Sequence, residues 1–165
     1  MSLPKTEGEG TIEEIKEAME LKHIPFIEDA GKKGVQILCL QEIFNTPYFC
    51  PGQDKQWYAS AEPVPGPTTE RMAEYAKKYN MVMIVPVYEK EQAGFLYNTA
   101  AVIDADGSYL GKYRKNHIPH TSGFWEKFSS NPEISVTPCF KPGMQKWEFT
   151  SVTTGIFPTV QESLV

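Results

Sequence analysis

The sequence predicts an α/β fold, in which helices and strands alternate along a chain of 165 residues. Helix-period apolar patterns at 11–30 and 68–80 alternate with short apolar runs that are typical of strands. A composition of 41% hydrophobic and 22% charged residues is typical of about one globular domain. The expected order is helix, strand, helix and three strands, which predicts a sheet with helices packed on a face.

The first helix is expected to begin after Thr11, which can cap it while Glu14 completes a capping box. Pro25 falls inside the apolar pattern and is expected to kink or split the helix. Gly31 and Gly34 are expected to end it.

The apolar run at 35–40 predicts a short strand buried on both faces, with Cys39 as a core residue. Glu42 follows at the carboxyl end of this strand, where α/β sheets present groups to ligands. Taken alone, Glu42 fits a solvated surface carboxylate better than a functional one, because most carboxylates are exposed. The long loop at 47–67 is rich in proline and aromatic residues, and we expect it to line a site.

A second helix and three strands complete the predicted sheet. They are expected at 68–80, 81–88, 97–104 and 108–113. A hairpin turn at 104–107 joins the last two strands, since Asp-Ala-Asp-Gly supplies turn-forming residues. Pro86 lies within the first of these strands and predicts a bulge or a sheet edge there.

Charge and motif content exclude several classes of function. Sixteen basic against 21 acidic residues give a net charge of -5, which argues against a nucleic-acid or anionic-membrane partner and favours a small molecule or a protein. No apolar run approaches the roughly 18 residues of a membrane-spanning helix. No glycine-rich phosphate loop occurs, and Pro119 between His117 and His120 argues against a metal pair, so we expect neither cofactor nor metal.

The three cysteines are unevenly spaced and do not form a disulfide framework. Met1 is not followed by an apolar leader, so we expect a reducing, cytoplasmic setting. Cys50 is a loop thiol without a histidine at a catalytic spacing. Lys115 and Glu126, each taken alone, are equally well explained as surface charges.

Several short sequence motifs that occur in a fixed order favour a functional role for these charged residues. They are the strand before Gln41-Glu42, Pro47-Tyr48-Phe49-Cys50, Pro65-Gly66-Pro67-Thr68-Thr69, Tyr97-Asn98-Thr99-Ala100 and Gly111-Lys112-Tyr113-Arg114-Lys115-Asn116-His117-Ile118-Pro119. Over about residues 11–128 the chain resembles the nitrilase superfamily of carbon–nitrogen hydrolases, and within it the N-carbamoyl amidases such as β-ureidopropionase. The resemblance implies an αββα sandwich, of which this chain would form about the N-terminal half without the first strand and the nucleophile strand.

The same resemblance implies roles for three residues. Glu42 would be the general base, Lys115 would stabilise the tetrahedral intermediate, and Glu126 would be a second acid that supports the lysine. Amide and ureido carbonyls are poor electrophiles, so the chemistry needs a thiol, a carboxylate that deprotonates it and a cation for the oxyanion. The family nucleophile, a cysteine in a C-Y-D or C-W-E motif, is absent from these residues. The implied partners are a small N-carbamoyl amine or amide substrate and further copies of the chain in a homo-oligomer.

The composition changes near Phe128. Only five of the 37 residues at 129–165 are charged, and 14 are Ser, Thr or Pro. Codons for the segment from Ser151 onward, read one base out of phase, can encode I-C-Y-D-R-H-F-P, which contains the missing motif. We therefore expect three regions: an N-terminal segment at 1–10, a partial hydrolase domain at 11–128 and a frameshifted tail at 129–165.

Three hypotheses follow from this division. The chain is an inactive fragment of a Cys-Glu-Lys amidase, or a non-catalytic short isoform that associates with full-length subunits. A stand-alone α/β binding module without chemistry is the third, and it requires the tail to be native sequence that forms its own strand.

Overall fold

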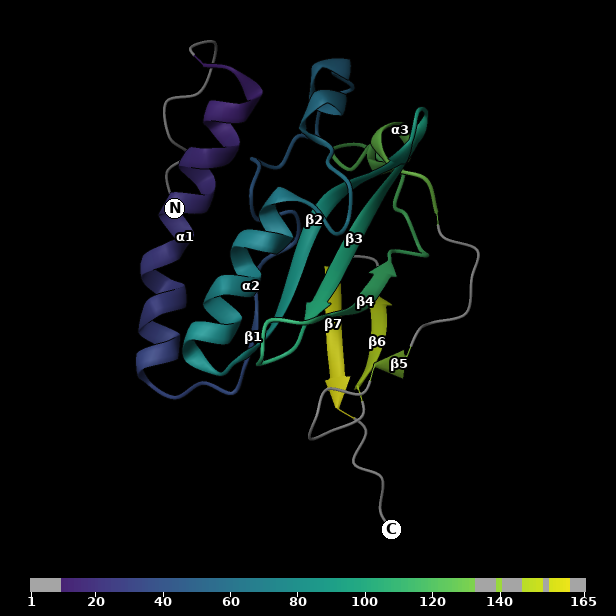
Figure 1. Ribbon diagram of the computed structural model, residues 1–165. Helices are drawn as coiled ribbons and strands as arrows, with labels where there is room; N and C mark the ends of the chain where they lie inside the picture. Colours follow the sequence, from purple (N-terminus) through teal and green to yellow (C-terminus); the bar gives the residue numbers. More distant parts are fainter. Residues whose placement is uncertain (1–9, 133–138, 141–146, 153–154, 161–165) are drawn as a thin grey trace.

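The computed structural model describes residues 10–132, 139–140, 147–152 and 155–160. In the main body a four-stranded sheet of order β1-β2-β3-β4 has α1 and α2 packed on one face (Figure 1). Its elements are α1 (Ile12–Lys32), β1 (Ile37–Cys39), the 3-10 helix η1 (Lys55–Ser60), α2 (Pro67–Tyr79), β2 (Val82–Gln92), β3 (Phe95–Ile103), β4 (Tyr109–Arg114) and α3 (Glu126–Ser129). The expected order of helices and strands is confirmed.

Helix α1 begins as expected but continues further than expected. The Thr11 side chain accepts a hydrogen bond from the Glu14 backbone N–H, and the Glu14 carboxylate accepts one from the Thr11 N–H, which completes the capping box. The helix runs unbroken through Pro25 for 21 residues, so the prediction that Pro25 splits it is wrong. A proline removes one backbone hydrogen bond, and Ile27, fully buried two residues later, holds the following turn on the core.

Gly31 lies inside α1 and does not end it. The helix is capped by Lys33, and Gly34 follows with a φ of 72°, a left-handed conformation that suits glycine. A Cβ atom on Gly31 would lie 2.2 Å from Cγ of Tyr79 in α2. Gly31 therefore allows the two helices to approach each other closely.

Strand β1 is an edge strand, and the prediction of a strand buried on both faces is wrong. It pairs in parallel with β2 alone within the described part of the chain. Ile37 and Leu38 are half-buried, and Cys39 is exposed, so the prediction that Cys39 is a core residue is also wrong. An apolar run fixes the strand but not its place in the sheet, because it does not specify which strands pair beside it.

Strands β2, β3 and β4 form an antiparallel meander, closed by the predicted turn in which the Gly107 N–H donates to the Asp104 carbonyl. Pro86 pairs with Ala100 without a bulge, inside a strand that has neighbours on both sides. The bulge predicted there is therefore wrong, but the predicted edge is present locally, because β1 pairs with β2 only as far as Ile84 within the described residues. Pro86 is tolerated because it lies beyond the end of the three-residue strand β1, where its missing N–H breaks no ladder hydrogen bond.

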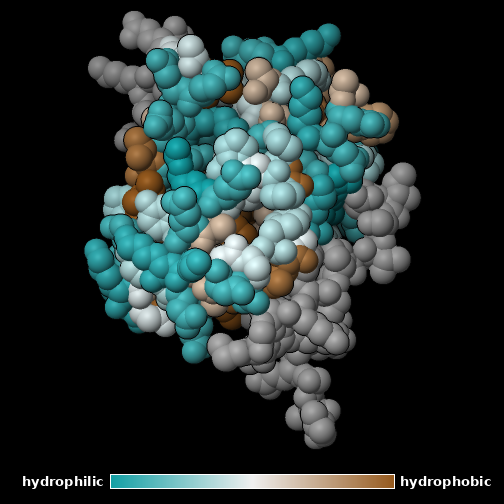
Figure 2. All heavy atoms as spheres, in the orientation of Figure 1, coloured by the Kyte–Doolittle hydropathy of each residue, from teal (hydrophilic) through white to brown (hydrophobic). Residues whose placement is uncertain are grey.

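The main core lies between the two helices and the sheet. Its fully buried members include Met81 and Met83 at the start of the β2 segment. A smaller buried cluster occupies the opposite face of the sheet, formed by Ile84, Ala100, Val102 and Tyr113. The surface over the helices is largely polar, with small separate apolar patches (Figure 2).

The tail contains a second, antiparallel sheet of order β5-β6-β7 (Figure 1). Its strands are β5 (Cys139–Phe140), β6 (Trp147–Val152) and β7 (Gly155–Val160). Most of the expected N-terminal segment at 1–10 and much of the tail lie outside the described residues, and the frameshift stays a prediction. No helix within the described part of the chain combines the length and apolar character that crossing a membrane requires.

Candidate active site

Three charged side chains from separate parts of the sequence meet at one end of the sheet. The Lys115 ammonium lies 2.8 Å from Oε1 of Glu42 and 2.8 Å from Oε2 of Glu126. The lysine side chain is fully buried, while those of Glu42 and Glu126 are 24% and 7% exposed. All three residues singled out in the sequence are thus brought into direct contact.

The turn after β1 directs Glu42 toward the lysine. The next residue, Ile43, has a φ of 46°, a left-handed conformation that is costly for a β-branched residue. Its side chain is buried beside Phe49 and Tyr88. The turn is tied to α2 by the Asn45 side-chain amide, which donates to the Thr68 hydroxyl at 3.0 Å. The carboxylate thus extends from a turn that is fixed on both sides.

Lys115 directly follows β4 and continues its pairing with β3. Its backbone N–H donates to the Asn98 carbonyl at 2.8 Å. The Asn98 side-chain amide in turn donates to Oε1 of Glu42 at 2.5 Å, so Asn98 contacts both members of the ion pair. Asn98 is 2% exposed.

Glu126 opens the short helix α3, which the long loop at 47–67 holds in place. The Trp125 backbone N–H donates to the Cys50 carbonyl at 2.9 Å. The Tyr48 hydroxyl lies 3.4 Å from Oε1 of Glu126. Two residues of this loop therefore contact the segment that carries Glu126, and the expectation that the loop lines a functional site stays a prediction.

Burial and charge act in opposite directions on the buried ion pair. Burial acts to lower the pKa of Lys115, but its hydrogen bonds to Glu126 and Glu42 outweigh burial, and the net pKa is raised. Burial raises the pKa of Glu126 despite its ion pair with Lys115. The raised pKa of Lys115 favours its charged form, whereas burial opposes ionisation of Glu126.

Cys50 is a component of this site to which the sequence reasoning gave no role. It is 3% exposed and packs with Ile43, Phe49 and Tyr88. Burial, together with the negative charges of Glu126 and Glu42, raises the pKa of its thiol to about 12. At that pKa about one thiol in 100,000 is ionised at pH 7. The Pro-Tyr-Phe-Cys motif was the sequence feature that could have pointed to Cys50 as a site residue. Its spacing, however, does not place the thiol beside a carboxylate.

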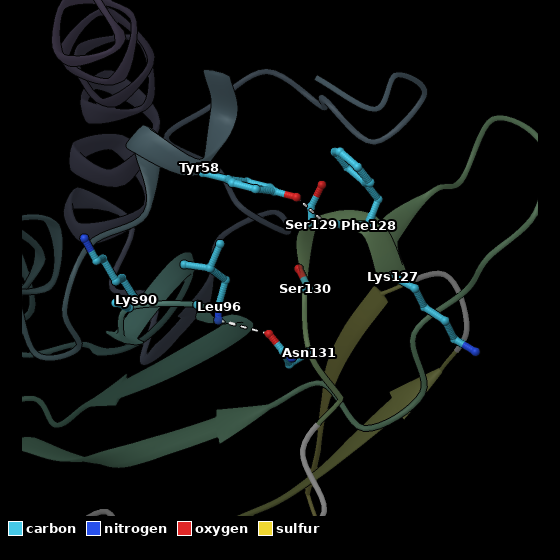
Figure 3. Close-up of a pocket in the computed structure, with 10 residues that line it drawn as sticks. Tyr58, Lys90, Leu96, Lys127, Phe128, Ser129, Ser130 and Asn131 are labelled. Carbon is cyan, nitrogen blue, oxygen red and sulfur yellow. Dashed lines mark hydrogen bonds between the residues drawn. The ribbon is translucent and has the colours of Figure 1, made fainter. Parts of the chain in front are cut away.

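A cavity of about 430 Å³ lies beside the same short helix, apart from the three charged groups (Figure 3). The Tyr58 hydroxyl closes one side by donating to the Phe128 carbonyl at 2.8 Å, and the Leu96 N–H donates to the Asn131 side chain at 3.1 Å. Its two lysines, Lys90 and Lys127, extend away from each other in Figure 3. Among the described residues that line this cavity, no charged groups converge on it.

Comparison with known proteins assigns the chain to a protein family. The model of the carbon–nitrogen hydrolase family matches residues 5–161, nearly the whole chain. The chain belongs to the carbon–nitrogen hydrolase family. The match extends beyond residues 11–128, the range over which the sequence motifs resemble the family.

Relatives within the carbon–nitrogen hydrolase family include a ureidopropionase and an amidase. β-Ureidopropionase of Arabidopsis thaliana is 44% identical over 104 residues, which are 62% of this chain and 26% of that protein. N-carbamoylputrescine amidase of Solanum lycopersicum is 42% identical over 107 residues, 64% of this chain and 35% of that protein. This chain therefore spans only about a quarter to a third of the length of these relatives.

A solved carbon–nitrogen hydrolase from Helicobacter pylori G27 has a similar fold. The TM-score is 0.74 at 28% sequence identity, over 79% of this chain and 45% of that one. The fold expectation, a part of the α/β sandwich of the nitrilase superfamily, is confirmed.

Proposed function

We propose that the gene encodes a hydrolase of N-carbamoyl amines or amides, in which Glu42 is the general base, Lys115 stabilises the oxyanion and Glu126 supports the lysine. The observation that carries the proposal is the buried ammonium of Lys115 between two carboxylates. A fully buried lysine with two carboxylate partners costs desolvation free energy, and such groups concentrate at functional sites.

The proposed reaction uses a thiol nucleophile. Glu42 takes the proton of the thiol, the thiolate attacks the carbonyl carbon, and the developing negative charge on oxygen is stabilised by Lys115. The carbon–nitrogen bond breaks as Glu42 returns this proton to the departing nitrogen, which leaves as ammonia. Water then gives a proton to Glu42 and attacks the carbonyl carbon of the covalent intermediate, and the carbon–sulfur bond breaks as the thiol is restored. Lys115 lowers the barrier because it binds the charged intermediate more strongly than the neutral substrate.

We further propose that the 165-residue chain is inactive by itself. None of its three cysteines lies in a C-Y-D or C-W-E motif. Cys50 is beside the carboxylates, but a pKa of about 12 leaves it protonated at neutral pH. The out-of-phase reading from Ser151 onward supplies the motif, which supports a frameshift near Phe128.

The test is ammonia release from N-carbamoyl-β-alanine and N-carbamoylputrescine by the purified chain. We expect none above background, and we expect activity when one base is restored near codon 128, with loss of that activity in Glu42→Gln. Hydrolysis by the 165-residue chain that Glu42→Gln abolishes would contradict its inactivity. A corrected-frame protein that folds but hydrolyses neither substrate would contradict the proposed substrate class. Sequencing the DNA across codons 120–140 tests the frameshift directly.

A second candidate is a non-catalytic short isoform that associates with full-length subunits in the cytoplasm. The open edge of β1 favours it, because an unpaired strand edge can accept another strand. Co-expression with a full-length relative distinguishes the two candidates: stable co-purification supports the isoform, and separate elution supports the inactive fragment. Protection of 129–165 from protease in the isolated chain would instead favour the stand-alone module.

A further inference from the structure

Asn98 contacts both members of the Glu42–Lys115 pair. Its backbone carbonyl accepts the Lys115 N–H at 2.8 Å, and its side-chain amide donates to Oε1 of Glu42 at 2.5 Å. The same carboxylate oxygen accepts the Lys115 ammonium at 2.8 Å. One residue of β3 thus fixes the main chain of the cation and the side chain of the carboxylate.

We propose that Asn98 is a positioning residue that fixes Glu42 by one oxygen and leaves the other free to take a proton. Within the described residues, Oε2 of Glu42 has no hydrogen-bond partner, whereas Oε1 has two. A carboxylate held in this way keeps its orientation without occupying the oxygen that acts as the base. The inference rests on the proposed role of Glu42 as general base.

The unpaired atom of the Asn98 side chain argues against a purely structural role. Asn98 is 2% exposed, and its Oδ1 has no hydrogen-bond partner among the described residues. A buried oxygen without a partner costs free energy, and an apolar residue of the same size would avoid that cost. The gain that accounts for an amide here is the hydrogen bond to Glu42.

Thr99 provides the matched control on the same strand. Its side chain is fully buried and donates one hydrogen bond to a carboxylate, that of Glu89, at 2.6 Å. As the next residue along β3 it points to the opposite face of the sheet. Asn98→Leu and Thr99→Val each replace a buried polar side chain by an apolar one of similar size.

The test measures how fast the Lys115 ammonium protons exchange with water, by NMR of the chain with 15N-labelled lysine side chains. The Lys115 signal is assigned by its absence in Lys115→Met. In Asn98→Leu, Glu42 loses a donor and can turn toward solvent, so we expect exchange at least about tenfold faster, as in Glu42→Ala. In Thr99→Val we expect exchange within about twofold of the starting chain.

Two results would overturn the proposal. One is an exchange rate in Asn98→Leu within about twofold of the starting chain while Glu42→Ala accelerates it. The other is the absence of any protected ammonium signal in the folded starting chain. If Asn98→Leu fails to fold, Asn98→Ala removes the same donor in a smaller side chain and is held to the same criterion. The readout does not depend on hydrolysis, so an inactive corrected-frame enzyme would refute the proposed function and leave this measurement informative.

Discussion

Cys50 lies in an environment that disfavours the ionisation of its thiol. Burial is the largest cause of the raised pKa of the thiol, and the negative charges of Glu126 and Glu42 raise the pKa further. The positive charge of Lys115 lowers it. Burial also raises the pKa of Tyr48, which lies beside the same carboxylates. The folded protein therefore keeps both groups neutral at a pH where an unfolded chain would ionise them.

This environment predicts that folding stability falls with alkaline pH. Between pH 9 and about 12 the unfolded chain has lost the Cys50 proton while the folded chain retains it, so the free energy of unfolding decreases as pH rises. The slope from this one group is at most about 1.4 kcal/mol per pH unit. Removing the thiol by Cys50→Ala should make the decline shallower over that range, as measured by urea unfolding from pH 8 to 10.5.

Cys50→Ser serves as the second variant in that series, because it also lacks a titratable thiol but keeps a heavy atom at the γ position. Both variants should show the same shallower decline whatever their stability at pH 8. A decline as steep as that of the starting chain in both would show that Cys50 does not titrate differently in the folded state.

At the scale of single residues, the sequence indicated the charged groups but not their surroundings. Glu42, Lys115 and Glu126 were assigned roles only by resemblance, and the structure places them in contact. Asn98 lay in a quoted block without an assigned role. Its contact with Glu42 depends on how β3 pairs with β2 and how β2 pairs with β1, and no local pattern specifies those registers.

At the scale of elements, local signals predicted helix ends and turns well. The capping box at Thr11 and the left-handed Asn80 that closes α2 were both readable, because each depends on a few neighbouring residues. The predictions of a bulge at Pro86 and of a helix end at Gly31 were wrong, because the structural roles of both residues depend on elements distant in the sequence. One lies past the end of β1, and the other faces Tyr79 of α2.

The packing role of Gly31 predicts an unusual response to substitution. Alanine normally favours a helix interior over glycine by about 1 kcal/mol. In Gly31→Ala the new methyl would lie 2.2 Å from the Tyr79 ring, so we expect a net loss of about 1–3 kcal/mol in unfolding free energy. Thermal or urea unfolding measures it.

Gly52→Ala is the matched control, because the nearest atom to its added Cβ is 3.9 Å away. It should change the unfolding free energy by less than about 0.5 kcal/mol. Tyr79→Ala, combined with Gly31→Ala, should recover part of the loss, since the two substitutions share one contact. Stabilisation by Gly31→Ala alone would show that α1 and α2 can move apart at little cost.

At the scale of the whole molecule, the sheet has open edges within the described part of the chain. The four strands end in β1 on one side and β4 on the other, and Cys39 of β1 is exposed. The chain spans 45% of the solved Helicobacter pylori hydrolase, so a large part of that fold has no counterpart here. An edge strand with apolar residues such as Ile37 and Leu38 can template pairing with another chain.

The open edge predicts concentration-dependent association that a charge on β1 suppresses. Cys39→Lys places a cation on the edge strand. In reducing buffer we expect the onset concentration, at which light scattering first appears, to be at least about twofold higher for this variant than for the starting chain.

Cys39→Ser controls for loss of the thiol. Gln53→Lys, at an exposed loop position, makes the same charge change elsewhere. Because the net charge is -5, an added lysine reduces overall repulsion and by itself favours association. A rise in the onset concentration with Cys39→Lys but not with Gln53→Lys would therefore identify the β1 edge as the site of association, and equal behaviour of the two lysine variants would contradict it.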